Sequence, residues 1–505
     1  MDKMVYSVWL LFLVYKLNLL ILFFSLTFNF AFSEELLRIY DLATENDSDL
    51  KIAAEKINEY DAQRISALSK FHSTLNFNID SRWNRFNSKN PLLGSETREF
   101  GTNEAGFTIN KVILNNVLDA DIKISDLQLE KIEFEYLKKR NELILDVLVG
   151  YFEILKFNET KKFILSQKKA VKEQLEQAKR NFIVGTATIT DQREAQAKYD
   201  LVYANEINIT NEIENSIDSL ELIAGNNLAN DFPSLLLPVK LLNPSPDNVD
   251  DWVNLSKSNN YDIKISNINT LIEEKKLLSA QSEMDSNLSA FSSATYSDGS
   301  NFGAYESTTV IAGLRFNLPL YKGAKVISNT AMKNSKLKQS IEALKNSEKQ
   351  VSYDVKKSFS KLKSSLAMVK ALKQANLSTK LQLEASKLGL EVGVRTAIDV
   401  LNSEQQMSDV NNQLFSAVVD SIISHAQLKY YAGVLTLSDL KKNKRIITVI
   451  KFNNIIFLTI FLFSCSQTDN YIGKKVDIYP VQKLKLAENK IYMIEDNYQI
   501  ANQDL

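Results

Sequence analysis

"EVGVRTAIDVLNSEQQ", residues 391–406, interrupts a sequence that otherwise favours very long helices. A related stretch, "IVGTATITDQREAQAK", occupies residues 183–198. The interval between Gly185 and Gly393 equals the interval between Asp191 and Asp399. The chain therefore makes the same corner twice.

The surrounding sequence repeats in the same order. "QLEQAKRNFIVG" (174–185) aligns without a gap with "QLEASKLGLEVG" (382–393), and the same interval places "NKVILNN" (110–116) on "LPLYKGA" (318–324). Helical sequence of low complexity can mimic repeats by chance, but matched corners and strand segments in one order disfavour that reading. We expect a first structural repeat over 34–240 and a second over 241–440.

Composition sets broad limits on the class of protein. The 505 residues include 60 Lys and Arg against 61 Asp and Glu, so the chain lacks the basic footprint of a nucleic-acid-binding protein. Gly (14) and Pro (7) are scarce, which suits long solvated helices. With one cysteine the chain cannot form an internal disulfide, and with two histidines a Cys/His metal site is disfavoured.

Both ends of the sequence carry targeting signals. Residues 1–33 have basic residues, an apolar run and a small-residue ending at Ala31-Phe32-Ser33, which predicts a signal peptide; a retained membrane anchor is the alternative. Residues 441–505 follow the repeats and contain a short apolar run before Cys465, a possible lipidation site. We expect this lipobox-like extension to lie outside the functional core of the protein, with a membrane-touching periplasmic appendage as the alternative.

Each repeat contains two segments with the two-residue period of β-strands. The first pattern puts Leu75, Phe77, Ile79 and Trp83 on one face, and the second does so for Ala312, Leu314, Phe316 and Leu318. Polar segments 84–104 and 297–307 are expected as the tips that join the strands. Four strands cannot close a membrane barrel, because the smallest have eight. They form either a soluble sheet or a barrel pooled from several chains.

A long helix follows each strand pair. Residues 118–182 contain one glycine and no proline, and residues 325–388 contain neither, so each helix would extend about 95–100 Å. Apolar residues at heptad spacing indicate coiled-coil packing along the second helix: Ile341, Val355, Leu362 and Val369 on one seam, and Leu337, Leu344 and Val351 on the other. A plain coiled coil would explain the helices but not the strands.

Several motifs together resemble the TolC-type outer-membrane efflux channel family over nearly all of 34–440. They are "LRIYDLATENDSDLK" (37–51), "LRFNLPLYKGA" (314–324) and the two glycine corners. Asn110-Lys111 departs from the Gln-Pro of the family.

The resemblance implies an α+β membrane protein with two internal repeats. Three chains would close a trimeric 12-stranded β-barrel, four strands from each, continued by a helical coiled-coil tunnel in the periplasm. The implied function is a passive exit duct of a tripartite efflux or type I secretion system in the bacterial outer membrane. The implied partners are two further copies, outer-membrane lipid, a periplasmic adaptor (membrane fusion) protein and an inner-membrane RND or ABC transporter.

The resemblance also assigns roles at the corners, Gly185 and Gly393, which would lie at the periplasmic tip. Arg395 corresponds to the arginine that ties the second hairpin to the first, with Thr190 and Asp191 as its partners. Asp399 corresponds to the first of two aspartates that ring the constriction. The tyrosine of the family's gate is Leu390 here, and the second aspartate is Asn402. Without the resemblance, an exposed Arg and Asp would read as an ordinary surface pair.

Two other classes of protein fit the sequence less well. A periplasmic enzyme would need convergent acid–base groups or a metal, and no phosphate loop, nucleophile elbow or paired His/Glu motif is present. We therefore expect no catalytic, cofactor or metal site. A periplasmic coiled-coil adaptor or structural protein of an export complex would not need two amphipathic strand pairs.

Overall fold

The computed structural model describes residues 35–443 apart from 91–93, 226–227, 229–231, 233–240, 242 and 301–302. The expected signal peptide and the C-terminal extension beyond residue 443, with Cys465, lie outside the described residues.

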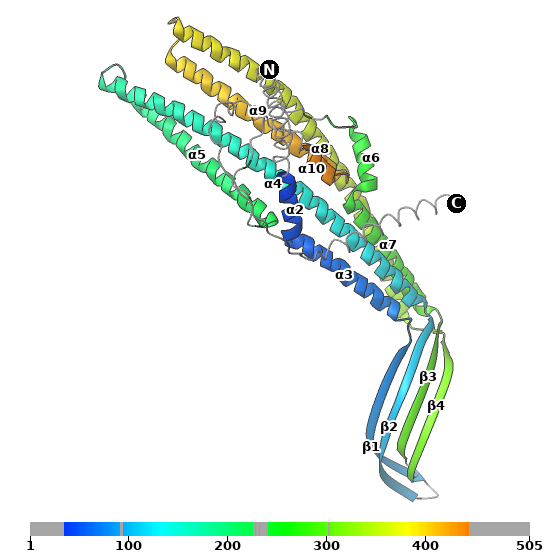
Figure 1. Cartoon of the computed structure of the whole chain (residues 1–505). Helices are drawn as coiled ribbons and strands as arrows, with labels where there is room; N and C mark the ends of the chain where they lie inside the picture. The colour runs from blue at the N-terminus through cyan, green and yellow to red at the C-terminus, as the bar shows by residue number, and fades with distance from the viewer. Residues whose placement is uncertain are drawn as a thin grey trace, which may run out of the picture. The chain divides into compact units, whose positions relative to one another are not determined.

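The two halves of the chain have the same order of elements (Figure 1). The first half contains α2 (Glu35–Asn46), α3 (Ser48–Ser69), β1 (Thr74–Asn90), β2 (Gly94–Leu114), α4 (Asn116–Ile183) and α5 (Ile189–Ala224). The second contains α6 (Val249–Asn259), α7 (Tyr261–Gln281), the short 3-10 turn η2 (Ser282–Met284), β3 (Asn287–Ser300), β4 (Gly303–Asn317), α8 (Ala324–Glu391) and α9 (Ala397–Tyr431), and α10 (Leu437–Asn443) follows it.

The two long helices match the expectation closely. α4 and α8 have 68 residues each, which corresponds to about 100 Å at 1.5 Å per residue. Of the expected heptad seams, Val351, Val355, Leu362 and Val369 are buried, whereas Ile341 is 37% exposed. No helix of the described residues is long and apolar enough to cross a lipid bilayer.

The four strands form one antiparallel sheet in the order β1-β2-β3-β4, so β1 and β4 are its unpaired edges in the described part of the chain (Figure 1). One face is apolar and exposed, as the sequence predicted. Phe77 pairs with Phe107 across β1 and β2, with ring centroids 4.8 Å apart, and Ile79 is 70% exposed. The opposite face is polar and carries the ion pair between Arg82 and Glu104. A sheet with one water-facing and one apolar exposed face is typical of barrels in lipid.

The expected polar tips are shorter than predicted, which corrects the sequence reading. β1 continues to Asn90 and β2 begins at Gly94, so most of 84–104 is strand, and β3 and β4 likewise extend to Ser300 and from Gly303. Polar side chains do not interrupt the main-chain ladder, and cross-strand pairs such as Arg85 with Glu99, 3.6 Å apart, accompany it.

The junctions between strand and long helix also differ between the halves. The sequence alignment equated 110–116 with 318–324, but β2 runs through Asn110 and Lys111 to Leu114, with an irregularity between Val112 and Leu114. β4 ends at Asn317, just before Leu318-Pro319. Proline has no N–H for the ladder, and since the first half has no proline at this junction, its strand pairing continues.

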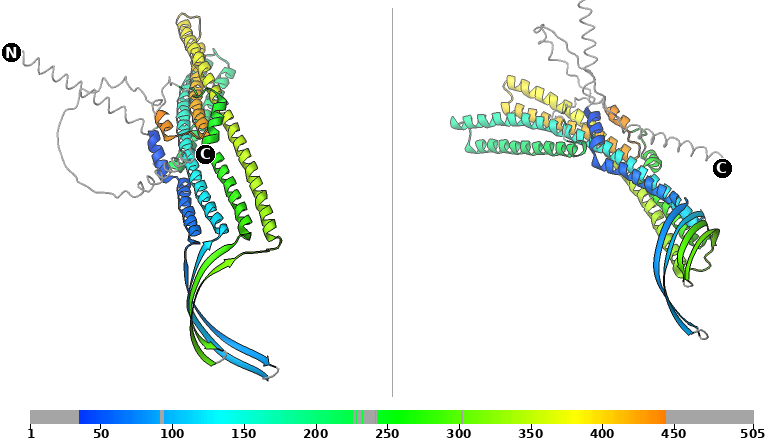
Figure 2. Two further views of the ribbon diagram at one scale, coloured as in Figure 1. Left: turned by 90° about the vertical axis from the view of Figure 1, so that its right-hand side faces the viewer. Right: turned by 60° about the horizontal axis from the view of Figure 1, so that its bottom comes forward.

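The helices pack in two rows that share α4 and α8. Next to the sheet the order is α3-α4-α7-α8, and toward the hairpin corners it is α5-α4-α9-α8 (Figures 1 and 2). The largest apolar core joins α4 to α9 and α2, so it connects the two halves of the chain. Its fully buried side chains include Ile39, Val147, Leu148, Tyr151, Phe152 and Val418.

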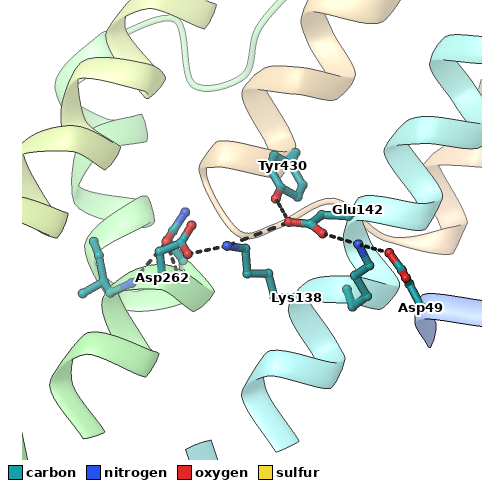
Figure 3. A network of polar contacts seen from close by, with 8 residues as sticks. Asp49, Lys138, Glu142, Asp262 and Tyr430 are labelled. Atoms are coloured by element: carbon teal, nitrogen blue, oxygen red, sulfur yellow. Dashed lines mark hydrogen bonds and ion pairs between the residues drawn. The ribbon is translucent and has the colours of Figure 1, made fainter. Parts of the chain in front are cut away.

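A polar network lies where the two rows meet (Figure 3). Lys138 Nζ of α4 is 2.6 Å from Asp262 Oδ1 of α7, and the Tyr430 hydroxyl of α9 donates to Glu142 Oε1 at 3.1 Å. Lys139 joins Glu142 to Asp49 of α3, with Nζ to Oδ2 at 3.1 Å. The network therefore links four helices from both halves of the chain.

Candidate gate at the helical corners

The first corner connects α4 to α5. α4 ends at Ile183, and Gly185 takes a φ of 77°, a left-handed conformation that glycine adopts without steric cost. The Thr186 N–H then donates to the Asn181 carbonyl at 2.8 Å, which satisfies one free carbonyl of the helix end. The reversal places Thr188 at the N-cap of α5.

The second corner, between α8 and α9, has the same geometry. Gly393 also has a φ of 77°, and the Val394 N–H donates to the Gly389 carbonyl at 2.9 Å. Thr396 is the N-cap of α9. The duplicated sequence pattern therefore encodes a duplicated turn.

Each corner carries a capping box that the sequence reading missed. The Asp191 carboxylate accepts the Thr188 N–H at 2.8 Å, and Thr188 Oγ1 accepts the Asp191 N–H at 3.2 Å. Asp399 and Thr396 make the same pair of bonds at 2.9 and 3.2 Å. The signal was available in the sequence as Thr-x-x-Asp beginning three residues after each glycine, a variant of the helix-start signature.

The capping bonds set the ionisation of both aspartates. Hydrogen bonds from Thr188 lower the pKa of Asp191. Hydrogen bonds from Thr396 lower the pKa of Asp399, with a smaller contribution from the positive charge of Arg395. Both carboxylates are therefore charged at neutral pH. In each, Oδ2 makes the capping bonds and Oδ1 accepts no hydrogen bond in the described residues.

Gly389 is a further corner residue that the sequence reading did not assign. A Cβ at this position would lie 2.6 Å from Cγ of Arg395, so a larger residue would displace the stem of the arginine. Gly389 itself is buried. It allows Arg395 to lie across the last turn of α8.

The other expected gate residues are accessible to solvent in the single chain. Thr190, Arg395 and Asn402 are exposed. Within the described part of the chain, no hydrogen bond or ion pair joins Arg395 to Thr190 or Asp191. The structure brings Arg395 near Asp399 of its own corner. In the described part of a single chain, Arg395 does not bond to the first hairpin.

Polar contacts hold the second hairpin together behind its corner. The Ser386 and Ser403 hydroxyls are 2.9 Å apart and buried, Lys387 Nζ is 2.9 Å from Glu404 Oε1, and Gln382 bonds Gln406 at 3.1 Å. The corner thus sits on a tightly paired antiparallel hairpin. No group of three or more His, Cys, Asp or Glu side chains in the described residues is arranged to hold a metal ion.

A sheet with an apolar exposed face, two unpaired edges and long paired helices defines a subunit of an outer-membrane channel. The family model described as "Outer membrane efflux protein" matches residues 39–226 and 285–434, and the chain belongs to this family. It is an outer-membrane exit duct whose helical part lies in the periplasm, with a trimeric 12-stranded barrel continued by a helical tunnel.

Among its relatives are proteins named for this role. The chain is 27% identical over 419 residues to the outer membrane protein TolC of Vibrio cholerae, covering 81% of this chain and 92% of the relative. It is 25% identical over 437 residues to the alkaline protease secretion protein AprF of Pseudomonas aeruginosa, covering 81% and 87%. The fold is similar to the CmeC outer membrane channel of Campylobacter jejuni, with a TM-score of 0.70, 17% identity and coverage of 82% and 89%.

Proposed function

We propose that the two corners form the periplasmic gate of this channel. In the closed state, Arg395 of one hairpin bonds Thr190 or Asp191 of a neighbouring hairpin, and three such links in the trimer hold the tunnel shut. Three Asp399 carboxylates face the narrow passage.

One observation carries this proposal. Asp191 uses a single carboxylate oxygen for its cap, and its Oδ1 accepts no hydrogen bond among the described residues. Arg395 lies exposed at the equivalent corner and makes no ion pair within 4 Å in the same part of the chain. A guanidinium donates well to a carboxylate oxygen that is free on one side, so the capped corner still offers the acceptor that a gate link needs.

The charge of Asp399 supports a weak cation site in the passage. Its lowered pKa keeps the carboxylate ionised, and a narrow passage lined by one sign of charge concentrates counter-ions. Asn402 supplies no second charge one turn further along α9. Block by multivalent cations is therefore modest in this channel.

The corners also support docking of a protein partner. Ile183 is 81% exposed and Val394 is 77% exposed, and Val184 and Val392 lie beside them. Exposed apolar residues grouped at one end of a molecule mark an interaction surface. We assign the partner as a periplasmic adaptor protein that connects the channel to an inner-membrane RND or ABC transporter. Relatives named for protease secretion support the ABC route, and efflux relatives support the RND route.

The repeat boundaries at 34–240 and 241–440 remain part of the proposal. The family match ends at residue 434, which supports placing 441–505 outside the channel. Leu440 of α10 is buried against the large core, so the channel proper extends to Leu440.

Single-channel conductance in planar bilayers tests the gate. Arg395→Ser removes the link and raises the conductance and the uptake of antibiotics from outside, whereas Lys172→Ser removes an exposed charge from α4 and changes neither. Asp399→Asn reduces cation selectivity and block by multivalent cations. If Arg395→Ser conducts like the parent and Asp399→Asn keeps its selectivity, the corners are ordinary helix turns and the gate lies elsewhere.

A further inference from the structure

We infer that α5 of one copy packs antiparallel along the corner-proximal half of α8 in the next copy, through a seam of opposite charge. This inference rests on the trimeric assembly. It starts from the row α5-α4-α9-α8, in which α5 packs along α4 and α8 packs along α9 (Figure 2). Within the described residues no comparable contact joins α5 to α8. One long face of α5 and one long face of α8 therefore have no helix of the described chain packed against them.

The two end helices carry opposite charge in equal amount. α5 has 36 residues, with eight acidic side chains against two basic ones, Arg193 and Lys198. The last 36 residues of α8, 356–391, carry eight lysines against two glutamates, Glu384 and Glu391. α4 lies inside the row and is nearly balanced, with 13 basic and 12 acidic residues. α9, the other inner helix, has four acidic residues and one basic residue, so the largest imbalances of charge lie at the two edges of the row and have opposite signs.

The charges lie on corresponding flanks of the two helices. Glu214 and Glu221 of α5 each follow a buried residue, Ile213 and Leu220. On α8 the three lysines Lys356, Lys363 and Lys370 follow the buried Val355, Leu362 and Val369 in the same way. Two antiparallel helices in contact are related by a local two-fold axis. If α5 and α8 meet through the faces that point away from their buried residues, the flank of α5 that carries Glu214 and Glu221 therefore lies beside the flank of α8 that carries the lysines.

The charged residues of α5 and α8 also lie at matching distances from the corners, if the corners of the two copies lie at the same height along the tunnel. Glu214 lies 25 positions after Ile189, the first residue of α5, and the position 25 before Glu391 is residue 366, between Lys363 and Lys370. By the same count Glu221 faces residue 359, between Lys356 and Lys363. Ile207 falls opposite residue 373, one turn from Leu377, and both Ile207 and Leu377 are about half exposed.

Few of these charges are neutralised within the chain. Lys363 pairs with Asp247 at 3.2 Å, but Lys356, Lys370, Glu214 and Glu221 have no ion pair among the described residues. Like charges along one helix repel each other, and that repulsion is relieved when the other helix supplies the opposite sign. The occupant with this charge and register is a second copy of the same chain.

Charge reversal of the full-length protein in detergent tests the seam. The pair Lys356→Glu with Lys370→Glu, and the pair Glu214→Lys with Glu221→Lys, should each lower the dissociation temperature of the trimer by several degrees. All four changes together should restore it. The control Lys172→Glu with Glu173→Lys, on the exposed side of α4, should leave the dissociation temperature unchanged.

Cross-linking gives an independent readout of the same contact. Glu214→Cys and Lys370→Cys are combined in a Cys465→Ser background, which removes the only natural cysteine. A bis-maleimide should then join copies into dimers and trimers on denaturing gels, and either cysteine alone should not. Trimers that neither cross-link nor regain stability with all four reversals would overturn the seam and leave the channel assembly standing. A parent protein that is monomeric at every salt concentration would overturn both.

Discussion

The hydroxyl of Tyr430, in the last turn of α9, donates a hydrogen bond of 3.1 Å to Oε1 of Glu142 in the middle of α4. Burial raises the pKa of Tyr430, and the neighbouring charge of Glu142 raises it further, so the phenol remains a donor. Glu142 also lies within 4 Å of Lys138 and Lys139. One tyrosine from the second half thus completes a charged network of the first half.

Tyr430→Phe should lower the free energy of unfolding by about 1 kcal/mol, because one partly buried hydrogen bond is lost while the ring is retained. The matched control is Tyr431→Phe, since the Tyr431 hydroxyl makes no hydrogen bond in the described residues. Thermal dissociation of the trimer, compared between the two variants, measures the difference. Equal stability of both variants would show that the bond contributes nothing.

His425 should make stability fall under mildly acidic conditions. Burial, together with a smaller effect of the positive charge of Lys429, lowers its pKa from 6.5 to about 4. Below pH 6.5 the imidazole binds a proton in the unfolded chain but stays neutral in the folded chain. The contribution of His425 to the free energy of unfolding is therefore fully present above pH 6.5 and declines by about 3 kcal/mol as the pH falls to 4. His425→Gln should flatten this decline in unfolding curves measured between pH 4 and 7. A parent with constant stability over that range would contradict the assignment.

The apolar face of the sheet should tolerate charge poorly. Ile79→Lys places an ammonium on the face that we assign to lipid, which costs up to about 2–4 kcal/mol near the middle of a bilayer. Asn78→Lys is the matched control, because adjacent strand residues point to opposite faces. Unfolding in lipid vesicles should separate the two variants. Equal losses would indicate that the faces have been assigned wrongly.

Thr396→Ala should weaken the start of α9 by about 1 kcal/mol, the usual effect of removing an N-cap side chain. Thr396→Ser keeps the hydroxyl and should restore the parent's behaviour. Hydrogen exchange of the backbone amides in the first turn of α9 reports the change directly. Faster exchange in both variants would mean that the methyl group, rather than the cap, stabilises the turn.

Sequence patterns determined much of this fold because they are local. The helix expected over 325–388 is observed as Ala324–Glu391, since a long stretch without Gly or Pro has no signal to end it. The apolar strand face was visible from a two-residue period. The extent of β2 was not, because its continuation to Leu114 depends on pairing with β3, nearly 180 residues away in sequence.

In the candidate site, too, local features could be predicted from the sequence and long-range contacts could not. The two glycines located both corners, and the family resemblance singled out Arg395. The contacts of each side chain depend on three-dimensional placement. Packing of Arg395 across Gly389 follows from the path of the turn, and the network around Glu142 joins four helices that no sequence pattern connects.

The capping boxes have a mechanical consequence. Because Thr188 with Asp191 and Thr396 with Asp399 close each corner on itself, the hairpins can swing as rigid levers without unwinding their ends. Ile183 lies 41 positions after Glu142 in α4, which gives an arm of about 60 Å. A rotation of about 5° at the polar network would carry the corner through about 5 Å, enough to separate a guanidinium from its carboxylate. A small rotation where the two rows of helices meet would thus suffice to open a passage at the far end of the tunnel.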